Sequence, residues 1–422
     1  MRYNARKRRS LRFTDFGKLW VGETISYMGA QISIIGLPLA AISLLQVSSF
    51  ELGLLNAFSF LPFLLSLFAG VIVDRTSKRR VLIFANLGRA FFLLGIPVMY
   101  WLNGLSIGIM CICAFLIGTC TVLFDAAFHP YIPKLIHQNR LVEANAKLIA
   151  SSSVATTAGP GIGGFLIKLL GPMLALVVNS FSYLFSAIML VAIKTVEQPT
   201  ENRKSLSIPK AIKNGLMFTL RNPTLRAIIG EAATYNFFSQ AFTTLLFVYV
   251  QQQLKLSEIT LGIFFSFGGV GALIGSILAK KAITKIGIGP ATVWSMIVGC
   301  SSLLLVPLAS GTTNTRIVII LTGFLINGIG LGLSNVNCIT LRQTIIPENM
   351  RATAMSASRL LTWGGIPLGA LLGGIMGEVL GIRETLFLAT IGMLLAPLWV
   401  ILSPLRNTHE LPAETIPDLT SK

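Results

Sequence analysis

Long apolar runs, broken by proline, glycine or charged residues, dominate this chain of 422 residues. Hydrophobic residues make up 53% of it and charged residues only 12%, which is about half the share typical of soluble domains. A soluble fold could not hide so much apolar surface, so the surrounding solvent has to be lipid. A membrane-spanning helix needs about 20 apolar residues, and most of the runs reach that length. The sequence therefore predicts an integral membrane protein built from helices.

The boundaries of the apolar runs predict twelve transmembrane helices. Several runs exceed the minimum length, which is consistent with tilted helices or with kinks at Pro38, Pro160, Pro307 and Pro367. The first run follows a basic N-terminus and is too long for a signal peptide, so we expect it to be retained. The predicted spans are residues 19–45, 51–73, 81–101, 105–128, 142–169, 171–193, 224–252, 257–279, 288–310, 315–340, 352–379 and 382–404.

Basic residues are distributed unequally between the two sides that twelve spans define. Most of the 34 lysines and arginines fall in the two tails and in the loops on the same side as the tails. Lysine and arginine are enriched in cytoplasmic loops, so both termini are predicted to be cytoplasmic, in the plasma membrane of a bacterial cell. This topology accounts for the net charge of +18 without a nucleic-acid partner. The opposite loops carry only Lys168, Lys255, Arg316 and Arg383.

The spans divide into two sets of six, separated by the one sizeable polar segment. Within that segment, Ile208, Ile212 and Leu216 share one helical face, which predicts a short amphipathic helix on the cytoplasmic surface; a plain linker is the alternative. The five cysteines lie in apolar segments and lack metal-ligand spacing, so we expect buried thiols. The expected domains are a tail (1–18), a six-helix bundle (19–193), a central loop (194–223), a second bundle (224–404) and a tail (405–422).

The two halves carry matching sequence features, which indicates an internal duplication. The first span contains "GETISY" at 22–27 and the seventh contains "GEAATY" at 230–235, an offset of 208 residues. Two further pairs follow at nearly the same offset, Gly70 with Gly275 and Pro160 with Pro367. Such a chain is expected to form two bundles related by a pseudo-two-fold axis, with substrate bound between the halves near the membrane midplane.

Two loop and helix signatures resemble those of the major facilitator superfamily. "GVIVDRTSKRR" after the second span is similar to its loop signature, and "AGPGIGG" in the fifth span is similar to its antiporter signature. "LWVGETISYMGAQ", "FHPYIPKLIHQNRLVEANA" and "GGIPLGALLGG" resemble the drug:proton antiporter subgroup that includes macrolide efflux proteins. The resemblance covers essentially the whole chain and implies the fold of this superfamily, in which two six-helix bundles alternate access to a central cavity.

The loop signature implies a conformational gate formed by Gly70, Asp74, Arg75, Arg79 and Arg80. In the superfamily the aspartate meets a helix N-terminus of the other bundle, here near 352–355, where free N–H groups and the helix dipole stabilise a carboxylate. Such a contact would favour the outward-facing state. The alternative is that this segment is only a basic cytoplasmic loop, without a role as a gate. In the second copy of the signature Ala279 and Lys280 replace the Asp-Arg pair, so we expect the gate to depend mainly on Asp74.

The antiporter signature comprises Gly159, Pro160, Gly163 and Gly164. Proline bends the helix, and glycines allow a second helix to approach closely. The resemblance places this span against the eighth, where "GGVGALIG" at 268–275 is equally small, and implies an interface on which the bundles rock. The alternative is that these glycines have no specific role, because glycine is common in membrane helices.

Ionisable residues inside spans are costly and point to function. The proton-coupling candidates are Glu23, Asp125 and Glu231, on three of the spans that the resemblance assigns to the cavity. Desolvation favours the protonated carboxyl group, and a bound cationic or polar substrate favours the ionised one, so substrate loading could release a proton. Arg89 is a possible ion partner of Asp125. The partner of Arg359 cannot be assigned from the sequence.

The expected substrate contacts are polar and aromatic residues on the cavity spans, although each could equally form an interhelical hydrogen bond. They are Tyr27, Gln31, Tyr235, Asn236, Gln240, Asn327 and Asn335. The function predicted is export of amphipathic, drug-like or macrolide-like molecules in exchange for protons, by a monomer without cofactor or metal, and hence a role in antibiotic resistance. The alternatives are a dedicated exporter of an endogenous siderophore, peptide antibiotic or lipid, a sensor that has lost transport, and a membrane enzyme.

Overall fold

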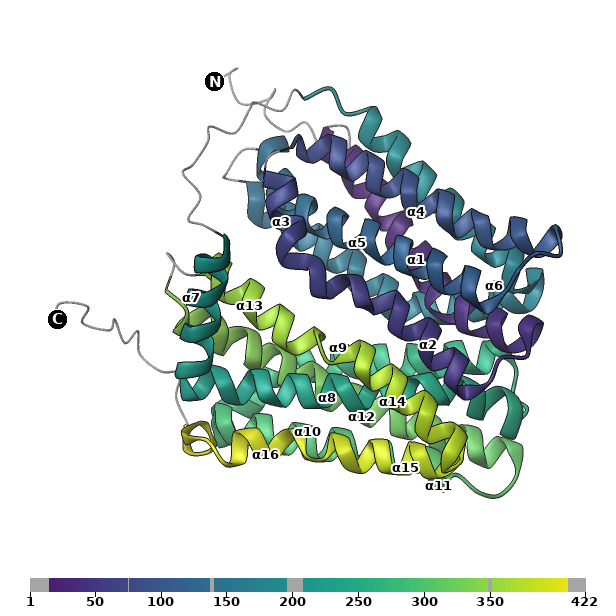
Figure 1. The fold of residues 1–422 in the computed structure, drawn as a ribbon. Helices are drawn as coiled ribbons and strands as arrows, with labels where there is room; N and C mark the ends of the chain where they lie inside the picture. Colours follow the sequence, from purple (N-terminus) through teal and green to yellow (C-terminus); the bar gives the residue numbers. More distant parts are fainter. Residues whose placement is uncertain (1–14, 75, 137–139, 196–207, 348–350, 409–422) are drawn as a thin grey trace, which may run out of the picture. The chain divides into compact units, whose positions relative to one another are not determined.

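The computed structural model describes residues 15–74, 76–136, 140–195, 208–347 and 351–408. Helices fill nearly all of these ranges, and no strand occurs in them (Figure 1). Nine of the helices described there are long and apolar enough to cross a bilayer. An α-helix satisfies every backbone polar group internally, which is the requirement that a lipid environment imposes. The chain is an all-helical, multi-pass membrane protein, as predicted.

The fifth and sixth predicted spans follow each other directly in α6 (Leu141–Val191), with a kink between them. Its 51 residues change direction at Gly171, whose φ of 78° and ψ of 161° are not helical. A residue with a side chain rarely adopts that φ, and glycine adopts it freely. Pro172 follows at once and restarts the helix. The two spans are thus joined by a single hinge residue without a loop.

Four other described spans are interrupted near prolines, and one of them is the twelfth, which consists of α15 (Ile382–Met393) and α16 (Ala396–Ile401). The second consists of α2 (Ser49–Phe60), a 3₁₀ stretch at Leu61–Leu65 and α3 (Ser66–Asp74). The ninth divides into α10 (Ile288–Ser302) and α11 (Leu305–Leu308), and the eleventh into α13 (Arg351–Trp363) and α14 (Ile366–Val379). With α6 counted as two spans, and with α2–α3 and α8 (Pro223–Val248) added, the described helices supply the predicted twelve.

The chain divides into two compact units. Residues Met1–Gln46 and Phe58–Arg203 group in the first, and Val47–Ala57 and Lys204–Lys422 in the second. The first unit contains α1 (Asp15–Leu45), α3, α4 (Lys78–Trp101), α5 (Ile107–Leu135) and α6. The second contains α7 (Ile208–Arg221), α8, α9 (Glu258–Ile286), α10, α11, α12 (Thr313–Ile345), α13, α14, α15 (Ile382–Met393) and α16 (Ala396–Ile401).

The beginning of α2 packs within the second unit. The Glu378 carboxylate of α14 accepts hydrogen bonds from the Ser48 hydroxyl at 3.3 Å and the Phe50 amide at 3.2 Å. Gly53 and Gly374 let the two helices touch, because a Cβ on Gly374 would lie 2.7 Å from the Ser49 carbonyl oxygen. One turn further along α2, the Asn56 amide donates to the Thr244 hydroxyl of α8 at 3.1 Å.

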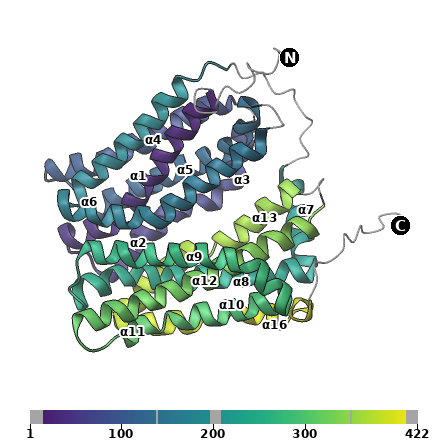
Figure 2. The same ribbon diagram turned by 180° about the vertical axis from the view of Figure 1, so that it is seen from behind.

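Close glycine packing joins α9 and α12, which run side by side in both views of the fold (Figures 1 and 2). A Cβ on Gly275 would lie 2.1 Å from the carbonyl oxygen of Ile329, and one on Gly332 would lie 2.0 Å from that of Ala272. Backbones can approach this closely only where side chains are absent. Within the second unit, the small-residue stretch at 268–275 therefore packs against α12.

The predicted central segment (194–223) contains a helix where the sequence predicts an amphipathic one. It is α7, which packs against α13 within the second unit. Residues 196–207 of the same predicted loop lie outside the described ranges.

Candidate functional site

A polar cavity of about 360 Å³ lies within the second unit, among α8, α12 and α13. Four residues predicted from the sequence line it: Glu231, Tyr235, Asn236 and Asn335. Four more of its lining residues were not predicted: Ser334, Cys338, Arg342 and Trp363. A mixture of aromatic surface and convergent polar groups is typical of a small-molecule site.

Glu231 occupies the buried wall of this cavity. Its side chain is 2% exposed, and the Ser334 hydroxyl donates a hydrogen bond to it at 2.9 Å. The Cys338 thiol donates a weaker one at 3.6 Å. Asn222 caps the start of α8, where its side-chain oxygen accepts hydrogen bonds from the amides of Thr224 and Leu225. Glu231 follows about two helical turns later.

Arg342 places a positive charge beside Glu231. Ser334, Cys338 and Arg342 are spaced four residues apart, so α12 presents all three on one face toward α8. The guanidinium attracts the charged form of Glu231, and its Nε is buried without a hydrogen-bond partner among the described residues. The predicted tenth span ends at residue 340, so Arg342 was expected in the cytoplasmic loop after it, whereas α12 continues to Ile345. The four-residue spacing was the signal that could have placed it in the site.

The other predicted contact residues of this unit mostly form interhelical hydrogen bonds. The Tyr235 hydroxyl donates to the Asn327 side chain at 3.4 Å, and the Asn327 amide donates to the Gly299 carbonyl at 2.9 Å. The Asn236 amide donates to the Thr362 carbonyl at 2.9 Å. Gln240 is half-buried and does not line the cavity.

Arg359 lies one helical turn before Trp363 on α13. Its guanidinium carbon is 5.1 Å from the centre of a ring of Trp363, within the range of a cation–π contact. Because Trp363 lines the cavity, Arg359 supports the wall of the site through this ring.

The first unit holds a second buried carboxyl group, that of Glu23 on α1. Glu23 is 1% exposed and accepts a hydrogen bond from the Ser186 hydroxyl of α6 at 2.9 Å. The Asn86 amide of α4 donates to the same hydroxyl at 2.9 Å, and Arg89 donates to Asn86. A polar chain thus links three helices at a depth where each group has to be satisfied internally.

Arg89 is held between two aromatic rings. Its guanidinium carbon lies 4.2 Å from the ring centre of Phe124 and 4.6 Å from that of Tyr183. The charge of Arg89 attracts the Glu23 carboxylate, and the charge of Asp125 repels it. All three of these groups act electrostatically on Tyr27. The structure therefore gathers Glu23, Tyr27, Arg89 and Asp125 into one electrostatic cluster.

The Arg89 contacts predict that lysine cannot replace this arginine. A lysine ammonium lacks the planar face that stacks on both rings. We expect Arg89→Lys to lower the free energy of unfolding by about 1–2 kcal/mol. Thermal unfolding of the purified protein in detergent checks this, with the exposed Arg80→Lys as the matched control. Equal melting temperatures for both variants would contradict it.

The predicted gate residues lie at the end of α3 and the start of α4. Arg79 donates hydrogen bonds to the carbonyl oxygens of Leu190 at 3.0 Å and Val191 at 2.8 Å. Arg80 is exposed, and open space surrounds the position where a Gly70 Cβ would stand. Arg75 and the side chain of Asp74 lie outside the described residues, so the gate remains a prediction.

The glycines of the predicted antiporter signature pack against α1 within the first unit. A Cβ on Gly159 would lie 2.5 Å from Cγ of Gln31, and one on Gly163 would lie 3.2 Å from Cα of Ile32. Pro160 and Gly164 are buried beside them. Gln31, a predicted substrate contact, thus lies against this signature. The predicted packing on the eighth span remains a prediction.

The sequence matches known transporters along most of its length. Residues 9–419 match the family described as transmembrane secretion effectors, a branch of the major facilitator superfamily (MFS). The uncharacterized MFS-type transporter y4rN of Sinorhizobium fredii is 24% identical over 361 residues, which cover 85% of this chain and 87% of the relative. The multidrug efflux pump Tap of Mycolicibacterium fortuitum is 23% identical over 357 residues, covering 82% and 85%.

Solved structures show the same fold. A bacterial homologue of the iron transporter ferroportin, in an inward-facing state, matches with a TM-score of 0.75 at 17% identity, covering 92% of this chain and 98% of the other. A bacterial homologue of the human lysosomal transporter Spinster matches with a TM-score of 0.70 at 12% identity, covering 92% and 96%. At these identities the likeness concerns the fold alone.

Proposed function

Because the chain belongs to the transmembrane secretion effector family of the MFS, it is a membrane transporter and not an enzyme, and we propose that it exports amphipathic small molecules in exchange for protons. The cargo is drug-like or macrolide-like. The multidrug efflux relative supports export as the direction and amphipathic compounds as the class. The bundles are proposed to alternate access to the cavity from the two sides of the membrane.

The observation that carries this proposal is the buried carboxyl group of Glu231 in the wall of a polar cavity. A carboxylate at that depth is costly unless it is protonated or paired. The Ser334 hydrogen bond and the nearby Arg342 favour its ionised form, whereas desolvation favours its protonated form. A cationic or polar cargo that enters the cavity adds to the first effect, so that cargo binding releases the proton. Glu23 is the corresponding candidate in the first unit, with Asp125 beside it.

The sidedness of transport follows from the basic loops. Both termini are proposed to lie in the cytoplasm and the chain in the plasma membrane of a bacterium, because lysine and arginine concentrate in loops on that side. Cargo then enters the cavity from the cytoplasm or its leaflet and leaves to the exterior. Resistance to an antibiotic among its cargoes would be the cellular consequence.

Efflux from energised cells tests the proposed function. Cells that produce the chain are loaded with ethidium or a fluorescent macrolide, and efflux is followed with and without a proton uncoupler. We expect export above the level of cells carrying the Glu23→Gln/Glu231→Gln variant, and loss of that difference when the uncoupler is added. Export that survives the uncoupler would overturn proton exchange, and no export of any probe would overturn the drug-like cargo class.

The gate predicts a kinetic effect at Asp74. If this carboxylate stabilises only the state closed to the cytoplasm, Asp74→Asn slows the conformational cycle and leaves the cavity intact. A dipole contact worth about 0.3–2 kcal/mol predicts a slowing of about 2–30-fold. Turnover of vesicle transport and the dissociation constant of the dye are measured on the same preparation. A collapse of binding affinity would contradict the gate.

A further inference from the structure

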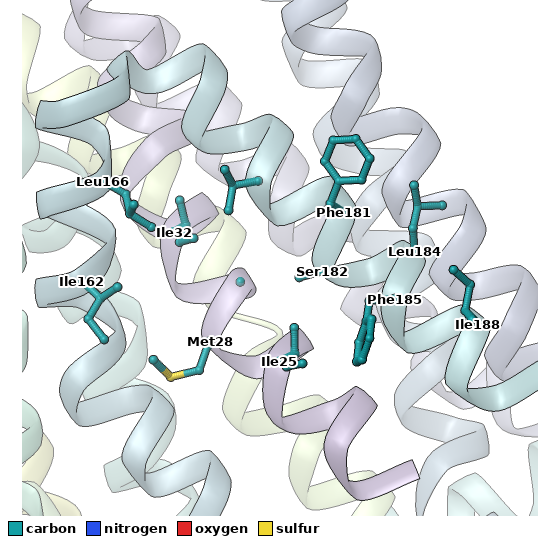
Figure 3. Close-up of a pocket in the computed structure, with 12 residues that line it drawn as sticks. Ile25, Met28, Ile32, Ile162, Leu166, Phe181, Ser182, Leu184, Phe185 and Ile188 are labelled. Atoms are coloured by element: carbon teal, nitrogen blue, oxygen red, sulfur yellow. The ribbon is translucent and has the colours of Figure 1, made fainter. Parts of the chain in front are cut away.

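A second, apolar cavity of about 690 Å³ opens along one side of the first unit. Figure 3 shows Ile25 and Met28 of α1 between the two segments of α6, with Leu166 on one segment and Phe181 and Ile188 on the other. α1 thus forms the floor of a groove, and the segments before and after Gly171 form its walls. We refer to it as the α1–α6 groove.

The walls of the α1–α6 groove are apolar and exposed. Phe181 is 61% exposed and Ile188 60% exposed, in a helix long enough to span the membrane twice. Large apolar side chains exposed on a membrane-spanning helix are suited to contact with lipid hydrocarbon. Ser182 is the one polar side chain among the lining residues, and its hydroxyl donates to the Asn179 carbonyl at 2.7 Å. The groove therefore offers an occupant hydrocarbon contact and almost no hydrogen bonding.

The length of the groove fits one leaflet. Its lining on the second segment of α6 runs from Val178 to Ile188. At 1.5 Å per residue this is roughly 15 Å along the helix axis. The hydrocarbon core of a bilayer is about 30 Å thick, so the groove extends over about half of it. One acyl chain of one leaflet matches that length.

Cationic residues gather at the Ile188 end of the groove. Arg79 donates to the carbonyls of Leu190 and Val191, and the Lys18 ammonium donates to the Ala192 carbonyl at 2.7 Å. The side chain of Lys194 is exposed two residues further on. Asp15 forms an ion pair with Lys18 at 2.7 Å and leaves this end with an excess of cations in the described residues. Basic groups at the membrane surface attract anionic headgroups.

We propose that the α1–α6 groove binds one acyl chain of an anionic phospholipid from the cytoplasmic leaflet, with its phosphate beside Arg79 and Lys194. The apolar lining of the groove and the excess of cations at its end favour an anionic lipid over a cationic cargo. Ser186, the partner of Glu23, lies on the same segment of α6 as Phe185 and Ile188. The bound chain therefore packs across the helix pair that holds the Glu23 carboxyl group in place.

Photo-labelling of the purified chain in vesicles tests the lipid site. Phosphatidylglycerol with a diazirine in mid-chain is activated, and the labelled peptides are mapped by mass spectrometry. We expect labelling to concentrate on residues 25–32 and 162–188. Met28→Trp or Ile162→Trp, which fill the groove, are each expected to lower it about tenfold, equivalent to about 1.4 kcal/mol. Ile34→Trp is the matched control, because Ile34 is 54% exposed on α1 and does not line the groove.

A second labelling experiment tests the role of the cations at the Ile188 end of the groove. The double variant Arg79→Gln/Lys194→Gln is expected to reduce labelling by phosphatidylglycerol and to leave labelling by a phosphatidylcholine probe unchanged. Equal labelling of the groove and of an exposed lipid face elsewhere, such as that around Ile277, would overturn the proposal. Labelling erased by excess ethidium or macrolide would overturn it in favour of a cargo site. These outcomes need no transport and are independent of the proposed function.

Discussion

Replacing Glu231 by glutamine is expected to lower proton-driven efflux about tenfold or more, which corresponds to at least about 1.4 kcal/mol in the transport barrier. Glutamine keeps the size of the side chain and can accept the Ser334 hydrogen bond, but it cannot exchange a proton. It also removes the negative charge that Arg342 attracts. The cavity should retain its shape, and the protein should remain folded. The loss is therefore expected in coupling and not in stability.

The measurement pairs efflux with proton release. Addition of a transported dye to purified protein in weakly buffered detergent should release protons from the wild-type chain and fewer from Glu231→Gln. Glu384→Gln is the matched control, because Glu384 is exposed in the first turn of α15 and lies outside the polar cavity. Uncoupler-sensitive efflux at the wild-type rate in Glu231→Gln would remove this residue from the coupling mechanism.

A side chain at Gly275 is expected to disrupt the second unit. The Cβ of Gly275→Val would lie 2.1 Å from the Ile329 carbonyl oxygen, a backbone atom that cannot rotate away. α9 and α12 would have to separate, and overpacking of this kind costs about 1–3 kcal/mol, occasionally more. We expect a markedly lower yield of monodisperse protein and a lower melting temperature in detergent.

Gly95→Val separates this packing effect from the general cost of valine in a helix. Among the residues that the structure describes, no atom lies within 4 Å of a Cβ built at Gly95 of α4. The two substitutions change the helix propensity in the same way, so the difference between their melting temperatures measures the α9–α12 contact. Equal melting temperatures would show that the backbones do not approach as closely as the structure has them.

The sequence predicted the helical fold well because a single physical requirement determines it. Apolar runs of membrane length have to become helices, so the number and order of the spans could be read directly. The interruptions were harder to place. Pro307 and Pro367 were expected to mark kinks and do lie beside helix breaks, and the predicted boundary between the fifth and sixth spans, at residue 170, lies next to the kink at Gly171. The breaks in the second and twelfth spans were not predicted, because they depend on how these helices pack.

The candidate site was predicted in part. Glu231, Tyr235 and Asn236 could be found because polar groups inside an apolar span are costly and therefore informative. Arg342 was missed because a cation near the end of a membrane helix usually indicates the cytoplasmic side of the membrane and not a binding site. Cys338 was interpreted as a small hydrophobic residue, and its contact with Glu231 depends on how α8 and α12 face each other. That pairing is a tertiary property, which the periodicity of one helix does not contain.

The glycine contacts between α9 and α12 also provide a fixed frame for spectroscopy. Two helices whose backbones touch at Gly275 and Gly332 have little freedom to slide, so a spin label on their outer face reports the position of the whole pair. Ile277 is 78% exposed and suits such a label. Distances from this anchor to labels on α4 would report how α4 moves relative to the α9–α12 pair during a transport cycle. The cysteine-free background needed for labelling should carry Cys338→Ser, which keeps a hydrogen-bond donor beside Glu231.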